Sequence, residues 1–263
     1  MPTVKDLTNL MEQLAPKKHI YFDADNVGFL VGDQNAECTT VIVCLDATNA
    51  VIDEAIKEKA QLIISHHPFI FYPLKSVTTN DLMGQKIIKA IKHGISIYSA
   101  HTNLDFSSGG INEFVATLYG VKKLTPIDPY IDQTQGAGRI GELDKSVSLE
   151  KFAVTVKKEL KENHVRILGD LSKSVKRVAV INGSGGAETK IIDACLAYKT
   201  DCLVTAEVKH HVAIYAKELG LSIIETSHFN SEHIYIEHLT QKLGSLNKGV
   251  KFVWAKSESN PFS

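Results

Sequence analysis

Short apolar runs, each followed by polar residues, recur along this chain of 263 residues. The runs at 62–64, 95–98 and 221–224 are bounded by turn residues and have the length of buried parallel strands. Between such runs, apolar residues spaced three and four positions apart predict helices, for example one around Ile52. Strands and helices that alternate in this way predict an α/β fold.

The second half of the sequence repeats the order of elements found in the first. A strand from Val41 opens a series of strands, helices and histidine clusters, and a similar series returns from Val178. We therefore expect two similar α/β lobes with mixed or parallel sheets, although common βαβ units can also resemble one another by chance. A stretch richer in glycine and charge begins near residue 125. It predicts a first lobe over 1–124 and a second over 125–263, whose C-terminal strand returns to the first lobe.

Clusters of histidine and acidic residues follow three of the predicted strands. Their members are His66, His67, His101, Asp105, His228 and Glu232. In open α/β sheets, ligands bind beyond the carboxyl ends of the strands, where these clusters fall. A lone histidine is more often a packed or surface residue, but three clusters at equivalent strand ends favour a metal site. We expect one composite site at the interface of the two lobes.

The side chains in these clusters indicate which metals and reactions to expect. Imidazole and carboxylate ligands suit zinc, iron or manganese, and a carboxylate can bridge two ions. Two neighbouring ions can activate water and stabilise developing negative charge, so hydrolysis is the default chemistry. The four cysteines show no CxxC spacing, so neither a zinc ribbon nor a disulfide framework is indicated, and Cys44 and Cys195 lie in strand or helix patterns that favour buried thiols.

Composition narrows the class of protein further. Hydrophobic residues make up 44% and charged residues 22% of the chain, as in ordinary globular proteins. A net charge of -1 gives no electrostatic reason to expect nucleic acid or a membrane as the main partner. The sequence shows neither a bilayer-spanning apolar stretch nor a signal-peptide pattern. We expect a cytoplasmic protein.

Seven blocks of the sequence together resemble the YbgI-like family, whose members carry the label GTP cyclohydrolase I type 2. The blocks are DNVGFLVG (25–32), LDAT (45–48), SHHP (65–68), HTNLD (101–105), GGIN (109–112), GRIG (138–141) and SHFNSE (227–232). They extend over nearly the whole chain and follow the order seen in the family. Their combination makes the resemblance specific.

The resemblance implies a two-lobed α/β fold, two divalent metal ions per chain between the lobes, and a toroidal homohexamer. By motif match, the metal ligands are His66, His67, Asp105, His228 and Glu232, with Glu232 as the bridge. His101 is a candidate ligand, proton shuttle or orienting group, and we favour one of the latter two roles. Whether the native ions are iron, zinc or manganese stays open.

Two further segments have both a functional and a plainly structural interpretation. Glu207, Lys209 and His211 lie in a segment that resembles a family block, although Ala206-Glu207 stands where the family usually has Gly-Asp. They are predicted to bind substrate, or simply to form the start of a helix. The glycine-rich loop at 182–186 precedes a predicted helix. Its amides can hold a phosphate, or the glycines can serve an ordinary turn.

The function implied by the resemblance is hydrolysis of GTP, in which the imidazole ring of the purine opens and formate is released. His101 would move the proton in that reaction. Two alternatives stay open at this stage. The same site can hydrolyse another small molecule, or the protein can be a non-catalytic metal-binding, metal-delivery or adaptor protein.

Overall fold

A computed structural model of the protein describes residues 1–132 and 134–262. The chain forms two compact units, each considered by itself below. Unit 1 contains residues 1–104 and the C-terminal part from 236 onward, and unit 2 contains residues 105–235.

The division falls at 104/105 rather than at the expected 124/125. Helix α5 (Ile111–Leu118) and strand β5 (Lys122–Thr125) belong to unit 2 because both pack against its strand β8 (Arg139–Ser148). The change of composition near residue 125 therefore marks a change within unit 2 and not the start of a new core.

Unit 1 is built on a five-stranded mixed sheet with the order β1-β4-β3-β2-β13. The strands are β1 (Gly28–Val31), β2 (Thr40–Cys44), β3 (Leu62–Ser65), β4 (Ser96–Ser99) and β13 (Lys251–Trp254). Four of them are parallel, and β1 pairs antiparallel with β4. The C-terminal strand β13 pairs with β2, so the chain returns to the first sheet.

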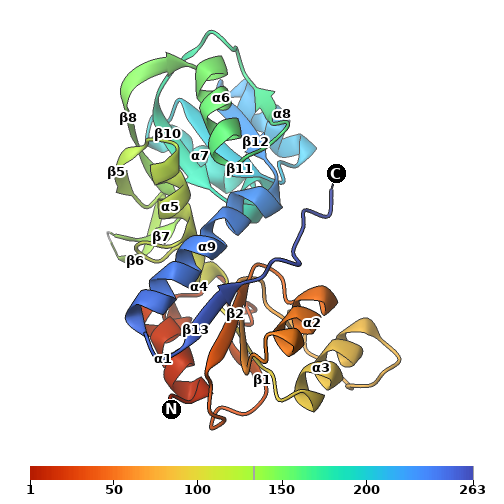
Figure 1. The fold of residues 1–263 in the computed structure, drawn as a ribbon. Coiled ribbons are helices and arrows are strands. Elements are labelled where there is room, and N and C mark those ends of the chain that lie inside the picture. Colours follow the sequence, from red (N-terminus) through yellow and green to blue (C-terminus); the bar gives the residue numbers. More distant parts are fainter. Residues whose placement is uncertain (133, 263) are drawn as a thin grey trace. The chain divides into compact units, whose positions relative to one another are not determined.

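Apolar faces of two helices cover one side of this sheet. The helices of unit 1 are α1 (Val4–Leu14), η1 (Lys17–His19), α2 (Asn49–Lys57), α3 (Leu82–Lys92), most of α4 (Thr102–Asp105) and the end of α9 (His228–Leu246). Ile52 of α2 and Ile87 of α3 pack in one buried core with Ile63 and Ile97 of the strands, and α2 and α3 lie side by side in Figure 1. Thr48 caps α2 by accepting a hydrogen bond from the Val51 amide.

Unit 2 has a six-stranded mixed sheet with the order β5-β8-β10-β11-β12-β9 and a separate β6-β7 pair. Its remaining strands are β6 (Asp128–Asp132), β7 (Gln135–Ala137), β9 (Arg166–Leu168), β10 (Ser174–Ile181), β11 (Cys202–Ala206) and β12 (Ser222–Thr226). Its remaining helices are α6 (Leu149–Glu159), η2 (Gly183–Ala187), α7 (Thr189–Ala197), α8 (His210–Glu218) and the start of α9.

The two units share a central arrangement. In unit 1 the parallel strands follow the order β4-β3-β2, and in unit 2 they follow the order β12-β11-β10. A histidine follows the last strand of each series, His101 after β4 and His228 after β12. The expectation of two similar α/β lobes with mixed sheets is therefore confirmed.

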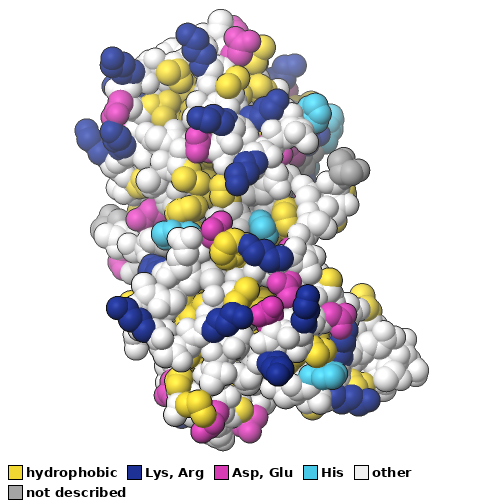
Figure 2. All heavy atoms as spheres, viewed as in Figure 1, with side chains coloured by type: hydrophobic (Ala, Val, Ile, Leu, Met, Phe, Trp, Pro, Cys, Tyr) yellow, Lys and Arg dark blue, Asp and Glu magenta, His cyan; other side chains and the backbone are white. Residues whose placement is uncertain are grey.

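Among the described residues, no helix combines the length and apolar character needed to cross a membrane. On the face shown in Figure 2, lysine and arginine side chains alternate with aspartate and glutamate. That face has no continuous basic area of the kind that binds nucleic acid.

Candidate metal centre

Three imidazoles of unit 1 converge at the carboxyl ends of β3 and β4. These strands are parallel neighbours in which Ser65 pairs with Ser99, so the residues that follow them emerge at one edge of the sheet. The ring centroid of His66 lies 5.0 Å from that of His67 and 5.3 Å from that of His101. One nitrogen of each ring lies within 4.8 Å of the others, which is close enough for all three to bind a single ion.

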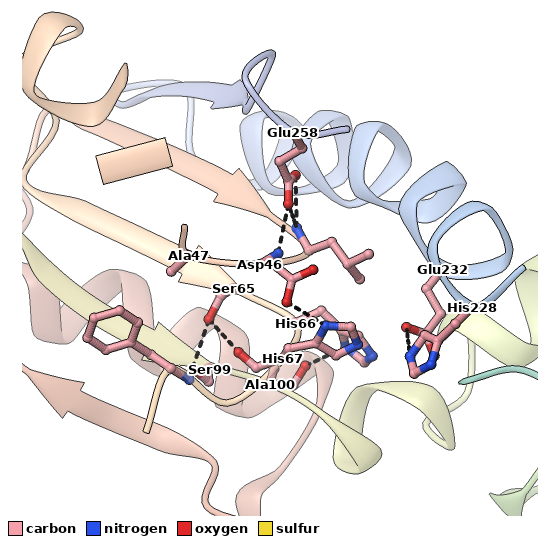
Figure 3. A network of polar contacts seen from close by, with 12 residues as sticks. Asp46, Ala47, Ser65, His66, His67, Ser99, Ala100, His228, Glu232 and Glu258 are labelled. Atoms are coloured by element: carbon pink, nitrogen blue, oxygen red, sulfur yellow. Dashed lines mark hydrogen bonds and ion pairs between the residues drawn. The ribbon is translucent and has the colours of Figure 1, made fainter. Parts of the chain in front are cut away.

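Each of these imidazoles has its Nδ1 atom held by an oxygen acceptor. The acceptors are the carbonyl of Ala100 for His66 at 2.8 Å and the carboxylate of Asp46 for His67 at 2.9 Å (Figure 3). For His101 the acceptor is an Asp25 carboxylate oxygen at 2.8 Å. When Nδ1 donates, the lone pair of a neutral imidazole lies on Nε2, the form that binds metal.

Asp25 belongs to the surroundings of the candidate site, although no sequence motif indicates a role for it. Its side chain is fully buried, and it accepts hydrogen bonds from His101 and from both the hydroxyl and the amide of Thr102. Burial raises the pKa of Asp25, but the hydrogen bonds from His101 and Thr102 outweigh it and lower the pKa below its ordinary value. An ionised Asp25 therefore orients the ring of His101.

A pair of serines fixes the backbone that carries His67. The Ser65 hydroxyl donates to the carbonyl of His67 at 2.9 Å and lies 2.8 Å from the Ser99 hydroxyl (Figure 3). Ser99 in turn accepts a hydrogen bond from the Phe69 amide. These buried contacts link the ends of β3 and β4 and hold the loop after His67 in place.

In unit 2, His228 and Glu232 occupy successive turns at the start of α9. His228 Nε2 lies 3.0 Å from a Glu232 carboxylate oxygen (Figure 3), and its Nδ1 lies 2.8 Å from an oxygen of Glu207. A neutral imidazole has only one N–H, whereas both of its nitrogens here face acidic oxygens. A cation shared by Nε2 and Glu232 satisfies this arrangement, so the two residues fit a metal ion.

A glycine lets the loop after β10 approach Glu232. Gly183 has a φ of +60°, and a Cβ atom at this position would lie 2.4 Å from the Glu232 carboxylate. Only glycine combines this backbone conformation with so close an approach. The glycine-rich loop at 182–186 thus has a structural role beside Glu232, and phosphate binding by its amides stays a prediction.

Asp105 lies in a segment of unit 2 that is held by two buried polar side chains. Asn112 donates to the Asp105 backbone carbonyl at 3.1 Å, and its oxygen accepts from the Asn182 amide at 2.8 Å. The guanidinium of Arg139 donates to the carbonyls of Phe106, Ser107, Gly136 and Gly138. Asn112 and Arg139 therefore tie Asp105 to the rest of its unit, a role that their sequence blocks did not reveal.

The three residues predicted to bind substrate have different surroundings. Glu207 follows β11 with a φ of 53° and contacts His228, so it orients a candidate ligand. Lys209 and His211 are exposed at the start of α8. Contact of all three with substrate stays a prediction.

The cysteines provide no alternative metal site. All four are buried free thiols, which confirms the prediction for Cys44 and Cys195. Burial raises the pKa of Cys38 to about 11 and that of Cys195 to about 12, and it raises the pKa of the other two as well. Such thiols stay protonated at neutral pH and are poor ligands.

Comparison with known proteins supplies relatives over the full length. The family model described as Duf34/NIF3 (NGG1p interacting factor 3) matches residues 2–261. Proteins named GTP cyclohydrolase 1 type 2 homolog include one from Clostridium perfringens, 34% identical over 98% of both chains, and one from Clostridium acetobutylicum, 36% identical over 98% of this chain and 96% of its own. The crystal structure of Staphylococcus aureus protein SA1388 covers 100% of this chain and 99% of its own, with a TM-score of 0.89 and 29% identity.

Proposed function

Because the chain belongs to the Duf34/NIF3 family, we propose that it is a metal-dependent hydrolase that acts on a small molecule in the cytoplasm, with ring opening of GTP as the leading reaction. The family assignment agrees with the resemblance carried by the seven sequence blocks. The observation that carries the proposal is the convergence of three imidazoles whose Nδ1 atoms are all held by acceptors.

The proposed centre holds two divalent ions and takes ligands from both units. Unit 1 supplies His66 and His67, and unit 2 supplies Asp105, His228 and Glu232. Nitrogen and carboxylate ligands of this kind fit iron, zinc or manganese. Bound ions of this type activate water for hydrolysis and stabilise negative charge that develops on the substrate.

His101 is the proposed proton shuttle. Asp25 holds its Nδ1, so the exchangeable lone pair lies on Nε2, and the centroid of the ring lies 5.3 Å from that of His66 and 5.9 Å from that of His67. The same carboxylate stabilises the imidazolium that forms when Nε2 takes up a proton. His101 can thereby accept a proton from water and return it to the leaving nitrogen of an opening ring.

Substrate and assembly complete the proposal. The names of the relatives suggest GTP as the substrate, and Glu207, Lys209 and His211 are the residues we assign to its binding. We further propose a toroidal homohexamer. Light scattering coupled to size exclusion tests this, and a hexamer gives about six times the chain mass of 28.9 kDa.

The decisive experiment measures formate released from GTP by protein loaded separately with Fe(II), Mn(II) or Zn(II). Wild type is compared with Glu232→Gln and with Glu237→Gln, which alters an exposed glutamate of the same helix. Metal-dependent formate that is lost only in Glu232→Gln supports the proposed reaction at this site. Two bound ions per chain without formate from any metal reject GTP ring opening, and non-catalytic metal binding then becomes the better description.

Whether one centre uses both units is tested by a double-mutant comparison. Metal affinity is measured for His66→Ala, Glu232→Gln and the combined variant. Ligands of a shared centre are coupled, so the two losses should differ from additivity by about 0.5 kcal/mol or more. Strictly additive losses indicate two independent metal sites and reject the shared centre.

A further inference from the structure

Three aromatic side chains, Phe22, Phe71 and Tyr72, form a connected cluster beside His101. Phe22 meets the His101 ring edge-on, with centroids 6.5 Å apart and an interplanar angle of 85°. Phe22 and Phe71 are 6.5 Å apart, and Phe71 and Tyr72 are 4.9 Å apart. We refer to these three residues as the aromatic cluster. It forms a series of ring contacts within unit 1 that begins at a candidate site residue.

The aromatic cluster is open to solvent although its rings touch one another. Phe22 is 38% exposed, Phe71 is 37% exposed and Tyr72 is 76% exposed. Single exposed apolar residues are ordinary on protein surfaces. Three contiguous aromatic rings that end at a histidine are less ordinary, because exposed apolar patches commonly mark a place where something binds.

Hydrogen bonds hold the loop that carries two of these rings. The Asn26 side chain donates to the Ile70 carbonyl at 2.6 Å, directly before Phe71. The backbone amide of the buried Phe69, two residues before Phe71, donates to the Ser99 hydroxyl at the end of β4. The backbone that leads to Phe71 and Tyr72 is therefore held at the end of β4, the strand that precedes His101, which reduces the ordering needed on binding.

We propose that the aromatic cluster binds the planar heteroaromatic ring of a small-molecule substrate and holds it beside His101. The two phenylalanines have no polar atoms, so they recognise the flat face of a ring, while the Tyr72 hydroxyl can meet a polar edge. Stacking of this kind tolerates different heterocycles, because every such ring has a π-face. The inference rests on the proposed function, since it names the class of substrate for the same site.

The test compares two probes that share sugar and phosphate and differ in the ring. Binding of guanosine 5′-monophosphate and of ribose 5-phosphate to Zn(II)-loaded protein is measured by calorimetry for wild type, Phe22→Leu, Phe71→Leu and Phe71→Trp. Leu74→Ala, at an exposed residue of the same loop, is the matched control. Leucine keeps apolar bulk but removes the ring, and tryptophan keeps an aromatic face.

We expect each leucine variant to bind the nucleotide about 5-fold to 100-fold more weakly, while Phe71→Trp and Leu74→Ala stay within about twofold of wild type. Binding of ribose 5-phosphate should not change in any variant. Equal weakening of both probes, or no weakening of the nucleotide, overturns the proposal. A leucine variant that alters only the oligomeric state also overturns it and assigns the cluster to contact with a second copy of the chain.

The readout separates this proposal from the proposed reaction. Ring-dependent binding without formate release from GTP retains the aromatic cluster as a ring-binding site and rejects the ring-opening reaction. Formate release whose KM is unchanged in Phe71→Leu retains the reaction and rejects the aromatic cluster as its ring-binding site.

Discussion

Replacement of Glu258 by glutamine should stabilise the metal-free protein at neutral pH and have little effect in mild acid. Glu258 follows β13, and its carboxylate accepts hydrogen bonds from the backbone amides of Leu45 at 3.0 Å and Asp46 at 2.7 Å (Figure 3). Burial raises the pKa of Glu258 to about 7, and the nearby Asp46 carboxylate adds to the increase. The hydrogen bonds from the two amides oppose burial without cancelling it.

The size of the effect follows from the change in pKa on folding. The ordinary value is 4.5, and the difference from about 7, at about 1.4 kcal/mol per pKa unit, corresponds to about 3 kcal/mol. Between these two pH values the folded protein binds the proton more tightly than the unfolded chain does. The free energy of unfolding of the wild type therefore falls by about 3 kcal/mol as the pH rises through this window, and the loss persists above it. Glutamine cannot ionise, so the variant escapes this loss.

The assay is equilibrium unfolding in urea with EDTA at several pH values from 4.5 to 8. Fluorescence of Trp254, the single tryptophan, reports on unit 1 from strand β13. Glu218→Gln, at an exposed glutamate of α8, controls for the loss of one negative charge. The stability difference between Glu258→Gln and wild type should grow with pH. A difference that is constant, or that shrinks as the pH rises, refutes the reasoning and means that the amide hydrogen bonds outweigh burial.

Three further substitutions probe groups that position the site. Asp25→Asn should lower the rate of formate release about 100-fold or more at unchanged metal content, because His101 loses the carboxylate that supports proton transfer. A fall in metal affinity would instead identify His101 as a metal ligand. Arg139→Met should lower the free energy of unfolding in urea by about 3 kcal/mol or more, since several buried carbonyls lose their donor at about 1 to 3 kcal/mol each, and a loss below about 1 kcal/mol would contradict this. Gly183→Ala should displace Glu232 and reduce the amount of bound metal, which elemental analysis measures. Gly220 has a similar φ but open space around it, so the control variant Gly220→Ala should keep its metal and lose only about 1 kcal/mol of folding stability. Equal metal content in the two variants would argue against a steric effect.

Local patterns predicted the central strands and helices because these elements depend on short-range features. The apolar runs that were too short for helices form β3 and β4 in the structure. The apolar residues spaced three and four positions apart around Ile52 form the buried face of α2. The order of these elements also indicated that the two units resemble each other. The division at 104/105 was not predicted, because composition does not show which sheet α5 and β5 join.

The roles of several site residues depend on contacts that no sequence pattern encodes. Asp25 and His101 are 76 residues apart, and Glu258 is 213 residues from Leu45. Each pairing exists because the chain folds back on itself and a buried polar group must find a partner. Arg139 belongs to the GRIG block (138–141), but only its buried hydrogen bonds show that it holds the segment after Asp105.

The sequence by itself determined which residue types stand at the strand ends, because a strand and the residues that follow it are contiguous in the chain. It thereby determined the histidines and carboxylates of the candidate site and the family resemblance. Tertiary structure alone decided which acceptor orients each imidazole and which rings lie beside His101. The physical reason is that hydrogen bonds and ring contacts depend on distance in space, which folding sets independently of separation along the chain.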